Sequence, residues 1–265
     1  MRVERYGTAG ADGRPLELWV QPRRDTSERR PGIVFVHGGG WAAFTPAIHA
    51  RDVRQMASLG WVAATISYRL TGEAPWPAAI EDVKCAIRWM RASADELGLD
   101  PDRIVVAGGS AGGHLAAMAA LTPGLLEGDG GHGDHSSAVQ AAVLWYPAVD
   151  LRALARTEGL VGAIDALLPG GTEADQLAAS PIAHVAGGAP PILTLTGDID
   201  GLTPLDAIDA FHIQLDDAGV VNELVVFEGR GHGFDFHPGD WLVCHERLTD
   251  FLAGAIPPAP VCSVP

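Results

Sequence analysis

A serine at position 110 stands among glycines in the stretch VVAGGSAGGHLAAM, which covers residues 105–118. Gly108, Ser110 and Gly112 form the pattern G-x-S-x-G, directly after an apolar run and before a segment that can be helical. This context is typical of a nucleophile elbow, a strained turn whose glycines prevent collisions and whose serine projects above a sheet. Phosphate loops need G-x-G-x-x-G or G-x-x-x-x-G-K-[ST], and this stretch has neither spacing. A glycine-rich turn with an incidental serine is the alternative.

A serine is a poor nucleophile at neutral pH unless a base and an acid activate it. His232, in the loop EGRGHGFD between the last predicted strand and the last predicted helix, is the expected base. Asp200, in LTGDIDGLTP, is the expected acid because a loop after the strand can bend it toward His232. Asp198 and Asp150 are the alternatives; Asp198 is better placed to hold its own loop by binding backbone amides.

An oxyanion hole is expected from the stretch FVHGGGW, residues 35–41. Glycines after a strand let backbone N–H groups approach a substrate oxygen without obstruction by side chains. Gly39 and Gly40, together with Ala111 after the serine, are the expected donors. We expect His37 to organise this loop and not to act as a base, because it precedes the glycines on the strand.

Aromatic residues near the expected site are candidates for a substrate pocket. The candidates are Trp41, Phe44, Trp76 and Phe234, with Phe236 close by. Ordinary packing in the core or at the rim is an equally good explanation for each of them.

The pattern of metal-ligating residues predicts neither a metal nor a cofactor. His132, Asp134 and His135 lie close together in GGHGDH, but they lack the helical spacing of a metal motif and have no obvious further ligand. The three cysteines are scattered and form no C-x-x-C pair. His114 is expected to pack against neighbouring loops.

Apolar strand-like runs alternate with helical patterns along the chain, which predicts an α/β fold with a mainly parallel sheet and helices on both faces. The predicted strands are 16–20, 33–37, 61–68, 103–109, 141–146, 191–196 and 223–227. The clearest helix covers 76–98, with Pro77 in its first turn and Gly98 at its end. Two more helices are expected over 205–219 and 241–252.

The length of 265 residues suits one α/β domain, 1–265, with a substantial core. Residues 151–190 contain helical fragments and no strong strand, so they are a candidate cap over the strand ends, where ligands bind in open α/β sheets. The Pro-rich tail 256–265 is expected to be extended.

The charge balance argues against polyanionic partners. Asp and Glu number 33 against 18 Lys and Arg, which gives a net charge of −15, so we expect neither nucleic acid nor anionic membranes as partners. The N-terminal stretch MRVERYGTAGADG has no apolar core of signal-peptide length. A cytoplasmic location is therefore expected.

Together these motifs resemble a known family. HGGGW, GGSAGGHLA, WYPAVDL, SPIAHV, GDIDGLTP and GRGHGF are similar to the α/β-hydrolase esterases of the feruloyl and acetyl-xylan esterase-like group, related to the hormone-sensitive-lipase-like carboxylesterases, over about residues 16–254. The resemblance implies an α/β-hydrolase fold with Ser110, Asp200 and His232 as nucleophile, acid and base. It also implies an acyl-enzyme cycle without metal or organic cofactor. Thr196 stands where many members have histidine, which alters loop packing.

The leading hypothesis is a hydrolase of small or medium carboxylic esters, whose partner is a small-molecule ester substrate. An arylformamidase or amidase using the same residues is the first alternative. A non-catalytic binding protein of the same fold is the second, and the complete set of serine, acid, histidine and oxyanion glycines argues against it. The oligomeric state stays open, with a homodimer among the possibilities.

Overall fold

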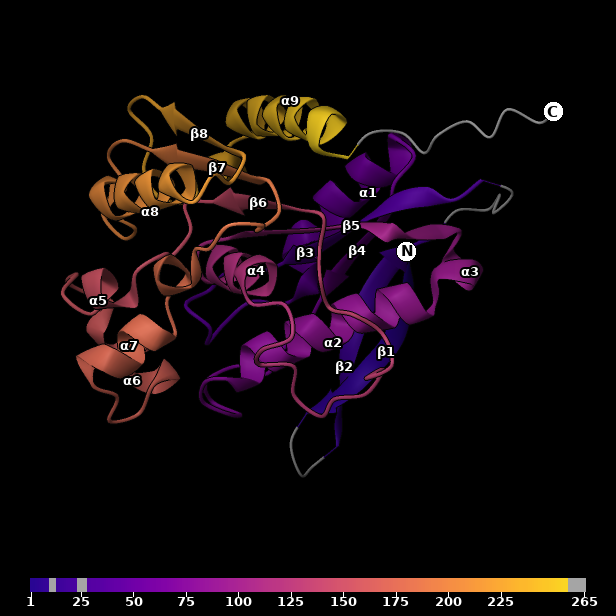
Figure 1. The fold of residues 1–265 in the computed structure, drawn as a ribbon, viewed down its shortest axis with the longest axis horizontal. Helices are drawn as coiled ribbons and strands as arrows, with labels where there is room; N and C mark the ends of the chain where they lie inside the picture. The colour runs from indigo at the N-terminus through magenta and orange to yellow at the C-terminus, as the bar shows by residue number, and fades with distance from the viewer. Residues whose placement is uncertain (10–12, 23–27, 257–265) are drawn as a thin grey trace.

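Within residues 1–9, 13–22 and 28–256, which the computed structural model describes, the chain forms an eight-stranded sheet in the order β1-β2-β4-β3-β5-β6-β7-β8 (Figure 1). The strands are β1 (Arg2–Ala9), β2 (Arg14–Gln21), β3 (Arg30–Val36), β4 (Val62–Ile66), β5 (Leu99–Gly109), β6 (Ala141–Trp145), β7 (Ile192–Gly197) and β8 (Asn222–Phe227). The pairs β1/β2 and β2/β4 are antiparallel and the other neighbours are parallel. The predicted mainly parallel α/β sheet is confirmed.

Helices cover both faces of this sheet (Figure 1). The α-helices are α1 (Ala50–Ser58), α2 (Ala78–Ala92), α3 (Ala94–Leu97), α4 (Ala111–Leu121), α5 (Leu151–Leu154), α6 (Val161–Leu167), α7 (Glu173–Ala178), α8 (Leu205–Asp217) and α9 (Pro238–Ala255). Short 3-10 helices are η1 (Pro46–His49), η2 (Pro181–His184) and η3 (Phe234–Phe236). Helices α2, α4 and α8 share one apolar core with the sheet, and α1 and α9 share the core on the opposite face. None of the helices in the described ranges has both the length and the apolar character that crossing a membrane requires.

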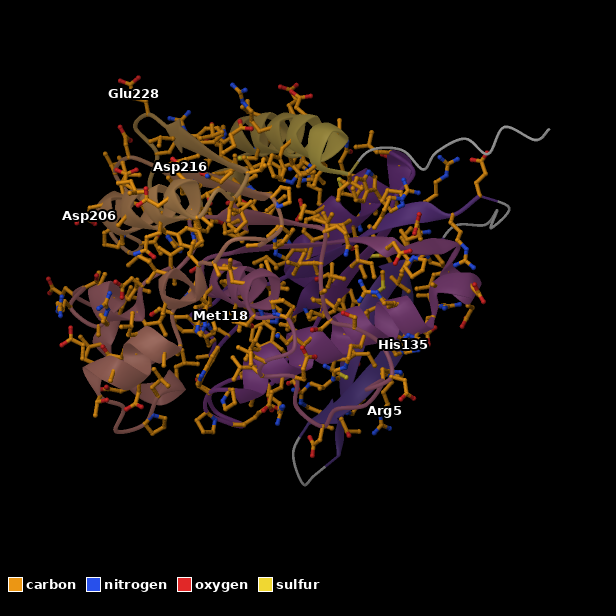
Figure 2. All side chains as sticks on the ribbon, viewed as in Figure 1. Arg5, Met118, His135, Asp206, Asp216 and Glu228 are labelled. Atoms are coloured by element: carbon orange, nitrogen blue, oxygen red, sulfur yellow. The ribbon has the colours of Figure 1, made fainter. Side chains whose placement is uncertain are left out.

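Helix α4 lies at the centre of the molecule, directly after β5. All of its residues are buried, and most of them are Ala or Gly. Because small side chains allow close approach, α4 packs tightly against the sheet. Its Met118 lies in the interior, whereas Asp206, Asp216 and Glu228 reach the surface (Figure 2).

The helix predicted over 76–98 is divided in the structure. Helix α2 ends at Ala92, and α3 follows after Ser93. Gly98 closes α3 with φ 66°, as expected of a glycine at a helix end. Pro77 precedes α2 as its N-cap instead of standing in the first turn, so that detail of the prediction is wrong.

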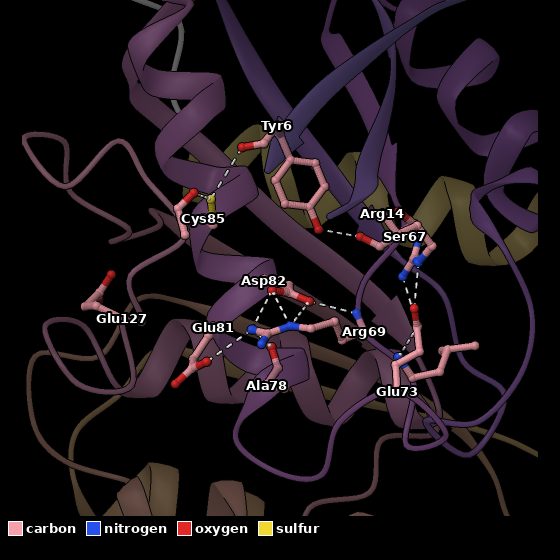
Figure 3. Close-up of polar contacts among 12 residues, drawn as sticks. Tyr6, Arg14, Ser67, Arg69, Glu73, Ala78, Glu81, Asp82, Cys85 and Glu127 are labelled. Atoms are coloured by element: carbon pink, nitrogen blue, oxygen red, sulfur yellow. Dashed lines mark hydrogen bonds and ion pairs between the residues drawn. The ribbon is translucent and has the colours of Figure 1, made fainter. Parts of the chain in front are cut away.

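Strand β1 was not predicted, because its charged residues conceal the apolar alternation of a strand. It is the edge strand of the sheet, and its Tyr6 is buried. The Tyr6 hydroxyl donates to the backbone oxygen of Ser67, just beyond β4 (Figure 3). Close by, Arg69 binds the Asp82 carboxylate of α2 at 2.8–3.0 Å (Figure 3). The Tyr6 bond attaches β1 to the segment after β4, and the Arg69–Asp82 pair attaches that segment to α2.

The candidate cap, 151–190, consists of α5, α6, α7 and η2. Its helices gather on one side of the molecule, near one end of α4 (Figure 1). Helix α7 begins with a capping box in which the Thr172 hydroxyl and the Asp175 carboxylate bind each other's backbone N–H. Of the predicted tail 256–265, all but Ile256 lies outside the described residues.

Candidate active site

Ser110 alone connects β5 to α4. Its backbone has φ 57° and ψ −122°, a strained conformation for a residue other than glycine. Its N–H donates to the carbonyl oxygen of Trp145 at 2.9 Å, and its own carbonyl accepts the N–H of His114 at 2.9 Å. The turn is thus held by the neighbouring strand β6 on one side and by α4 on the other.

Glycines on both sides of Ser110 leave room for this turn. A Cβ atom at Gly108 would lie 2.5 Å from the carbonyl oxygen of Gly112, and one at Gly112 would collide with the carbonyl oxygen of Val36. Gly38 also lies close to the turn, because a Cβ there would lie 2.8 Å from the carbonyl oxygen of Gly109. The steric role predicted for Gly108 and Gly112 is confirmed.

The structure brings together Ser110, His232 and Asp200 from three separate loops. The Ser110 Oγ lies 2.9 Å from Nε2 of His232, and Nδ1 of His232 lies 2.8 Å from Oδ2 of Asp200. An ionised carboxylate only accepts hydrogen bonds, so the proton of a neutral imidazole belongs on Nδ1. Nε2 is then free to accept the serine hydroxyl proton.

Asp200 is buried and held by several donors. Its Oδ1 accepts the N–H groups of Leu202 at 2.8 Å and Thr203 at 3.1 Å, and its Oδ2 accepts the Thr203 hydroxyl at 2.8 Å. Burial raises the pKa of Asp200, but hydrogen bonds from His232 and from these backbone amides outweigh it, so the pKa lies below its usual value. The carboxylate therefore stays ionised at neutral pH.

The two alternative acids have other partners. Asp198 accepts the backbone N–H of Gly229 at 2.7 Å, which fastens its own loop to the turn after β8. Asp150 caps α5 and binds Arg152 at 2.8 Å. Asp200 is the one of the three candidates that contacts His232.

Tyr146 and Asp235 support His232, and sequence reasoning did not single out either of them. The Tyr146 ring centroid lies 4.5 Å from that of His232, and the Tyr146 hydroxyl donates to Oδ1 of Asp235 at 2.5 Å. This bond joins the end of β6 to the loop that carries His232. The available signals were a tyrosine at a strand end and an aspartate three residues after the histidine, and neither is specific.

The glycine loop after β3 has backbone conformations that only glycine adopts easily. Gly39 has φ 97° and Gly40 has φ 57°, and the Gly39 carbonyl accepts the N–H groups of Ala42 and Ala43 at 3.1 Å. In the described ranges, no protein acceptor binds the backbone N–H of Gly39, Gly40 or Ala111. All three residues line the cavity above Ser110.

Two buried histidines stabilise this loop. Nδ1 of His114 accepts the indole N–H of Trp41 at 3.2 Å, and its Nε2 donates to the carbonyl oxygen of Ala179 at 2.7 Å. His37 stacks on Tyr68 with ring centroids 4.3 Å apart. Burial lowers the pKa of each histidine to about 4, so both are neutral at pH 7. His114 thus packs against neighbouring loops, as predicted.

A cavity of about 450 Å³ lies above Ser110. Of the predicted aromatic residues, Trp41 and Phe44 line it, as does Phe236. Trp76 and Phe234 do not: the Trp76 ring packs against His114 at 5.4 Å, and Phe234 packs against Phe227 at 4.7 Å. Sequence reasoning missed further lining residues, among them Ile48, His49, Arg51, Asp52, Trp145 and Trp241.

The histidine-rich loop lies in a separate region. His132, Asp134 and His135 are exposed, and His135 lies on the α2 side of the molecule (Figure 2). In the part of the chain that the structure describes, no three His, Cys, Asp or Glu side chains converge as metal ligands.

The parallel sheet, the strained serine turn and the hydrogen-bonded Ser, His and Asp define the α/β-hydrolase class. The BD-FAE family model matches residues 17–215 of the chain. Two solved structures of esterase 2 from Thermogutta terrifontis are similar to it: the propionate-bound form has a TM-score of 0.85 and the form phosphonylated by sarin 0.86. Each is 34% identical, with 98% of this chain and 96% of the other covered. The chain therefore belongs to the BD-FAE family of α/β-hydrolase esterases, and the predicted resemblance is confirmed.

Curated relatives include larger proteins. Esterase LipQ of Mycobacterium tuberculosis is 34% identical over 93% of this chain, and the match covers 60% of LipQ. The chain thus spans little more than half the length of this relative.

Replacement of Gly112 by alanine is expected to destabilise the fold, because the added Cβ collides with the backbone of β3. The expected loss in the free energy of unfolding is about 1–3 kcal/mol or more, measured by urea denaturation. Gly254→Ala is the control, because nothing lies within 4 Å of a Cβ there and α9 tolerates alanine. Equal stability of the two variants would contradict the steric account of the turn.

The buried histidines predict a loss of stability in mild acid. Because the folded-state pKa of His114 is about 4, against 6.5 for a free histidine, the unfolded chain binds more protons between these pH values. The free energy of unfolding should therefore fall as the pH drops from 6.5 to about 4, by roughly 3 kcal/mol for this group.

The variant His114→Gln tests this assignment, because glutamine does not titrate. The stability difference between wild type and variant should shrink as the pH falls, in urea denaturation at a series of pH values. His135→Gln, at an exposed position, should follow the wild-type profile. A constant difference between wild type and His114→Gln would show that His114 is not the titrating group.

Proposed function

We propose that the protein hydrolyses carboxylic esters of small or medium size through an acyl-enzyme intermediate. Ser110 is the nucleophile, His232 the general base and acid, and Asp200 the group that orients the imidazole. The observation that carries the proposal is the hydrogen-bond chain from the Ser110 hydroxyl through His232 to Asp200, at 2.9 and 2.8 Å. Esterase relatives of the same family support it.

Acylation begins when the Ser110 Oγ attacks the carbonyl carbon of the ester. The hydroxyl proton passes to Nε2 of His232, and the carbonyl oxygen becomes an oxyanion. The ionised Asp200 stabilises the imidazolium that forms. His232 then gives this proton to the leaving alkoxide as the C–O bond breaks, which releases the alcohol and leaves the acyl group on Ser110.

Deacylation repeats these steps with water. His232 takes a proton from the water as it attacks the acyl carbon, and returns the proton to the Ser110 oxygen as the acid leaves. The products are one alcohol and one carboxylic acid, and the enzyme is restored.

The backbone N–H groups of Gly39, Gly40 and Ala111 are the proposed donors to the oxyanion. They line the cavity and have no protein acceptor within the described ranges, so no internal bond has to break when the negative charge develops. One donor of this kind typically supplies about 3 kcal/mol of transition-state stabilisation.

The substrate size is inferred from the cavity and from the structural relatives. A cavity of about 450 Å³ accommodates a small or medium ester. The Thermogutta terrifontis esterase has been solved with propionate bound, which is a short acyl product. We also propose that the chain is one domain in which 151–190 is a cap, because Leu154 and Leu160 of this segment line the cavity.

Substitution of the nucleophile tests the proposal. With a short-chain p-nitrophenyl ester, Ser110→Ala should lower kcat by about 10⁴-fold or more, because no other group takes over the attack. Thermal unfolding of the variant should match the wild type. Wild-type turnover by Ser110→Ala would overturn the assignment.

The choice of acid is tested separately. Asp200→Asn should lower kcat by about 10⁴-fold, because an amide does not stabilise the imidazolium and favours the wrong tautomer. Asp198→Asn is the matched control two residues earlier, and its kcat should stay within a few-fold of the wild type. A larger loss in Asp198→Asn than in Asp200→Asn would move the acid to position 198.

A further inference from the structure

The cavity above Ser110 has an apolar part and a polar part. The apolar part lies on the side of the core that includes α4, and its residues are Trp41, Ala148, Leu154 and Leu160. The polar part comes from the opposite face of the sheet, where η1 and α1 meet α9, and its residues are His49, Arg51, Asp52 and Trp241. The catalytic mechanism proposed above uses none of these four polar-part residues.

The Asp52 carboxylate is already occupied by three N–H groups. Its Oδ2 binds Nδ1 of His49 at 2.7 Å, and its Oδ1 accepts from Trp241 Nε1 at 2.6 Å and His245 Nε2 at 2.8 Å. Burial raises the pKa of Asp52, but the hydrogen bonds from His245 and His49 outweigh it and hold the pKa well below its usual range. Asp52 is therefore a stable anion that fixes the Trp241 ring.

Arg51 lies on this fixed ring. Its Cζ is 3.6 Å from the centroid of Trp241, and within the described ranges the guanidinium has no hydrogen-bond or carboxylate partner. Stacking on an aromatic face leaves the N–H donors in the guanidinium plane free. Within the described ranges the exposed residues Arg54 and Arg247 are unpaired too. Arg51 is also exposed, and it differs from them because it lines the cavity and stacks on Trp241.

We propose that Arg51, held in place by Trp241, is a subsite that binds a free carboxylate group of the ester substrate. The preferred substrates are then esters that carry a second, unesterified acid on either the acyl or the alcohol part. The guanidinium matches a carboxylate with two parallel hydrogen bonds, whereas neutral esters offer no such group. This inference rests on the proposed esterase function.

The net charge of the protein does not oppose this subsite at close range. The summed charge of −15 repels anions at a distance, but solvent-exposed charges are largely screened beyond about 8 Å at physiological ionic strength. Asp52 keeps its negative charge, but its carboxylate oxygens already bind N–H groups of His49, Trp241 and His245. At contact distance the Arg51 guanidinium is the cation nearest to a ligand on the Trp241 ring, and it attracts a carboxylate there. The preference for anionic esters should consequently weaken as salt is added.

Two matched pairs of esters test the subsite. In one pair the acid is on the alcohol part, and para-acetoxybenzoate is compared with the neutral para-acetoxybenzamide. In the other pair the free acid is on the acyl part, and the phenyl monoester of glutaric acid is compared with the phenyl ester of glutaric acid monoamide. The ratio of kcat/KM for the anionic over the neutral ester is measured for the wild type, Arg51→Gln and Arg54→Gln. Arg54 is the control because, like Arg51, it is an exposed arginine of α1, but it does not line the cavity.

In Arg51→Gln the ratio should fall by about tenfold or more for at least one pair, chiefly through KM. Arg51→Lys, which keeps the charge without the planar donor pair, should retain part of the ratio. Arg54→Gln should equal the wild type, and the pair that responds identifies which part of the ester faces Arg51.

An unchanged ratio in Arg51→Gln for both pairs, while Ser110-dependent hydrolysis of the neutral esters continues, would overturn the subsite and leave the proposed function intact. An equal fall in Arg54→Gln would overturn it too, because it would show a general charge effect. If the wild type hydrolysed none of the four esters, the proposed function would fail and the subsite with it.

Discussion

Ser110 has to turn the chain from β5 into α4 within one residue, and its neighbours are arranged around this strained backbone. Gly108 and Gly112 must lack a Cβ, since either would collide with a carbonyl oxygen. Gly38 lies against the same turn, which brings the glycine loop after β3 beside the serine. The loops after β7 and β8 reach the same place because the carboxyl ends of parallel strands share one edge of the sheet. The strained residue Ser110 at the end of β5 is therefore surrounded by the loops that follow β3, β7 and β8.

The titratable groups at this edge of the sheet have different protonation states, which match their different roles. His37 and His114 are buried with a pKa of about 4 and support the loop as neutral rings. Asp200 is buried too, but its hydrogen-bond donors keep it ionised. The same physical cause, removal from water, therefore acts on all three groups, and the hydrogen bonds available to each decide the outcome. In the proposed mechanism, His232 is the group left to exchange protons.

The central sheet and the serine site could be predicted because their signals are local. Buried parallel strands are continuous apolar runs, and the elbow, the histidine loop and the acid loop each follow such a run. Strand β1 was missed because its residues are mostly charged or polar. The bonds from Asp52 to Trp241 and His245 join residues about 190 positions apart, and no local pattern announces them. Whether an aromatic loop residue faces the cavity depends on such packing, which explains why Trp41 lines it and Trp76 does not.

Covalent labelling with a fluorophosphonate, followed by mass spectrometry of the peptides, tests the central claim most directly. Such probes react with a serine only where a base activates it and an oxyanion site receives the phosphonyl oxygen. The account predicts one adduct per folded molecule, on the peptide that contains Ser110, and no adduct after unfolding in urea. Labelling at another residue, or no labelling of the folded protein, would contradict it.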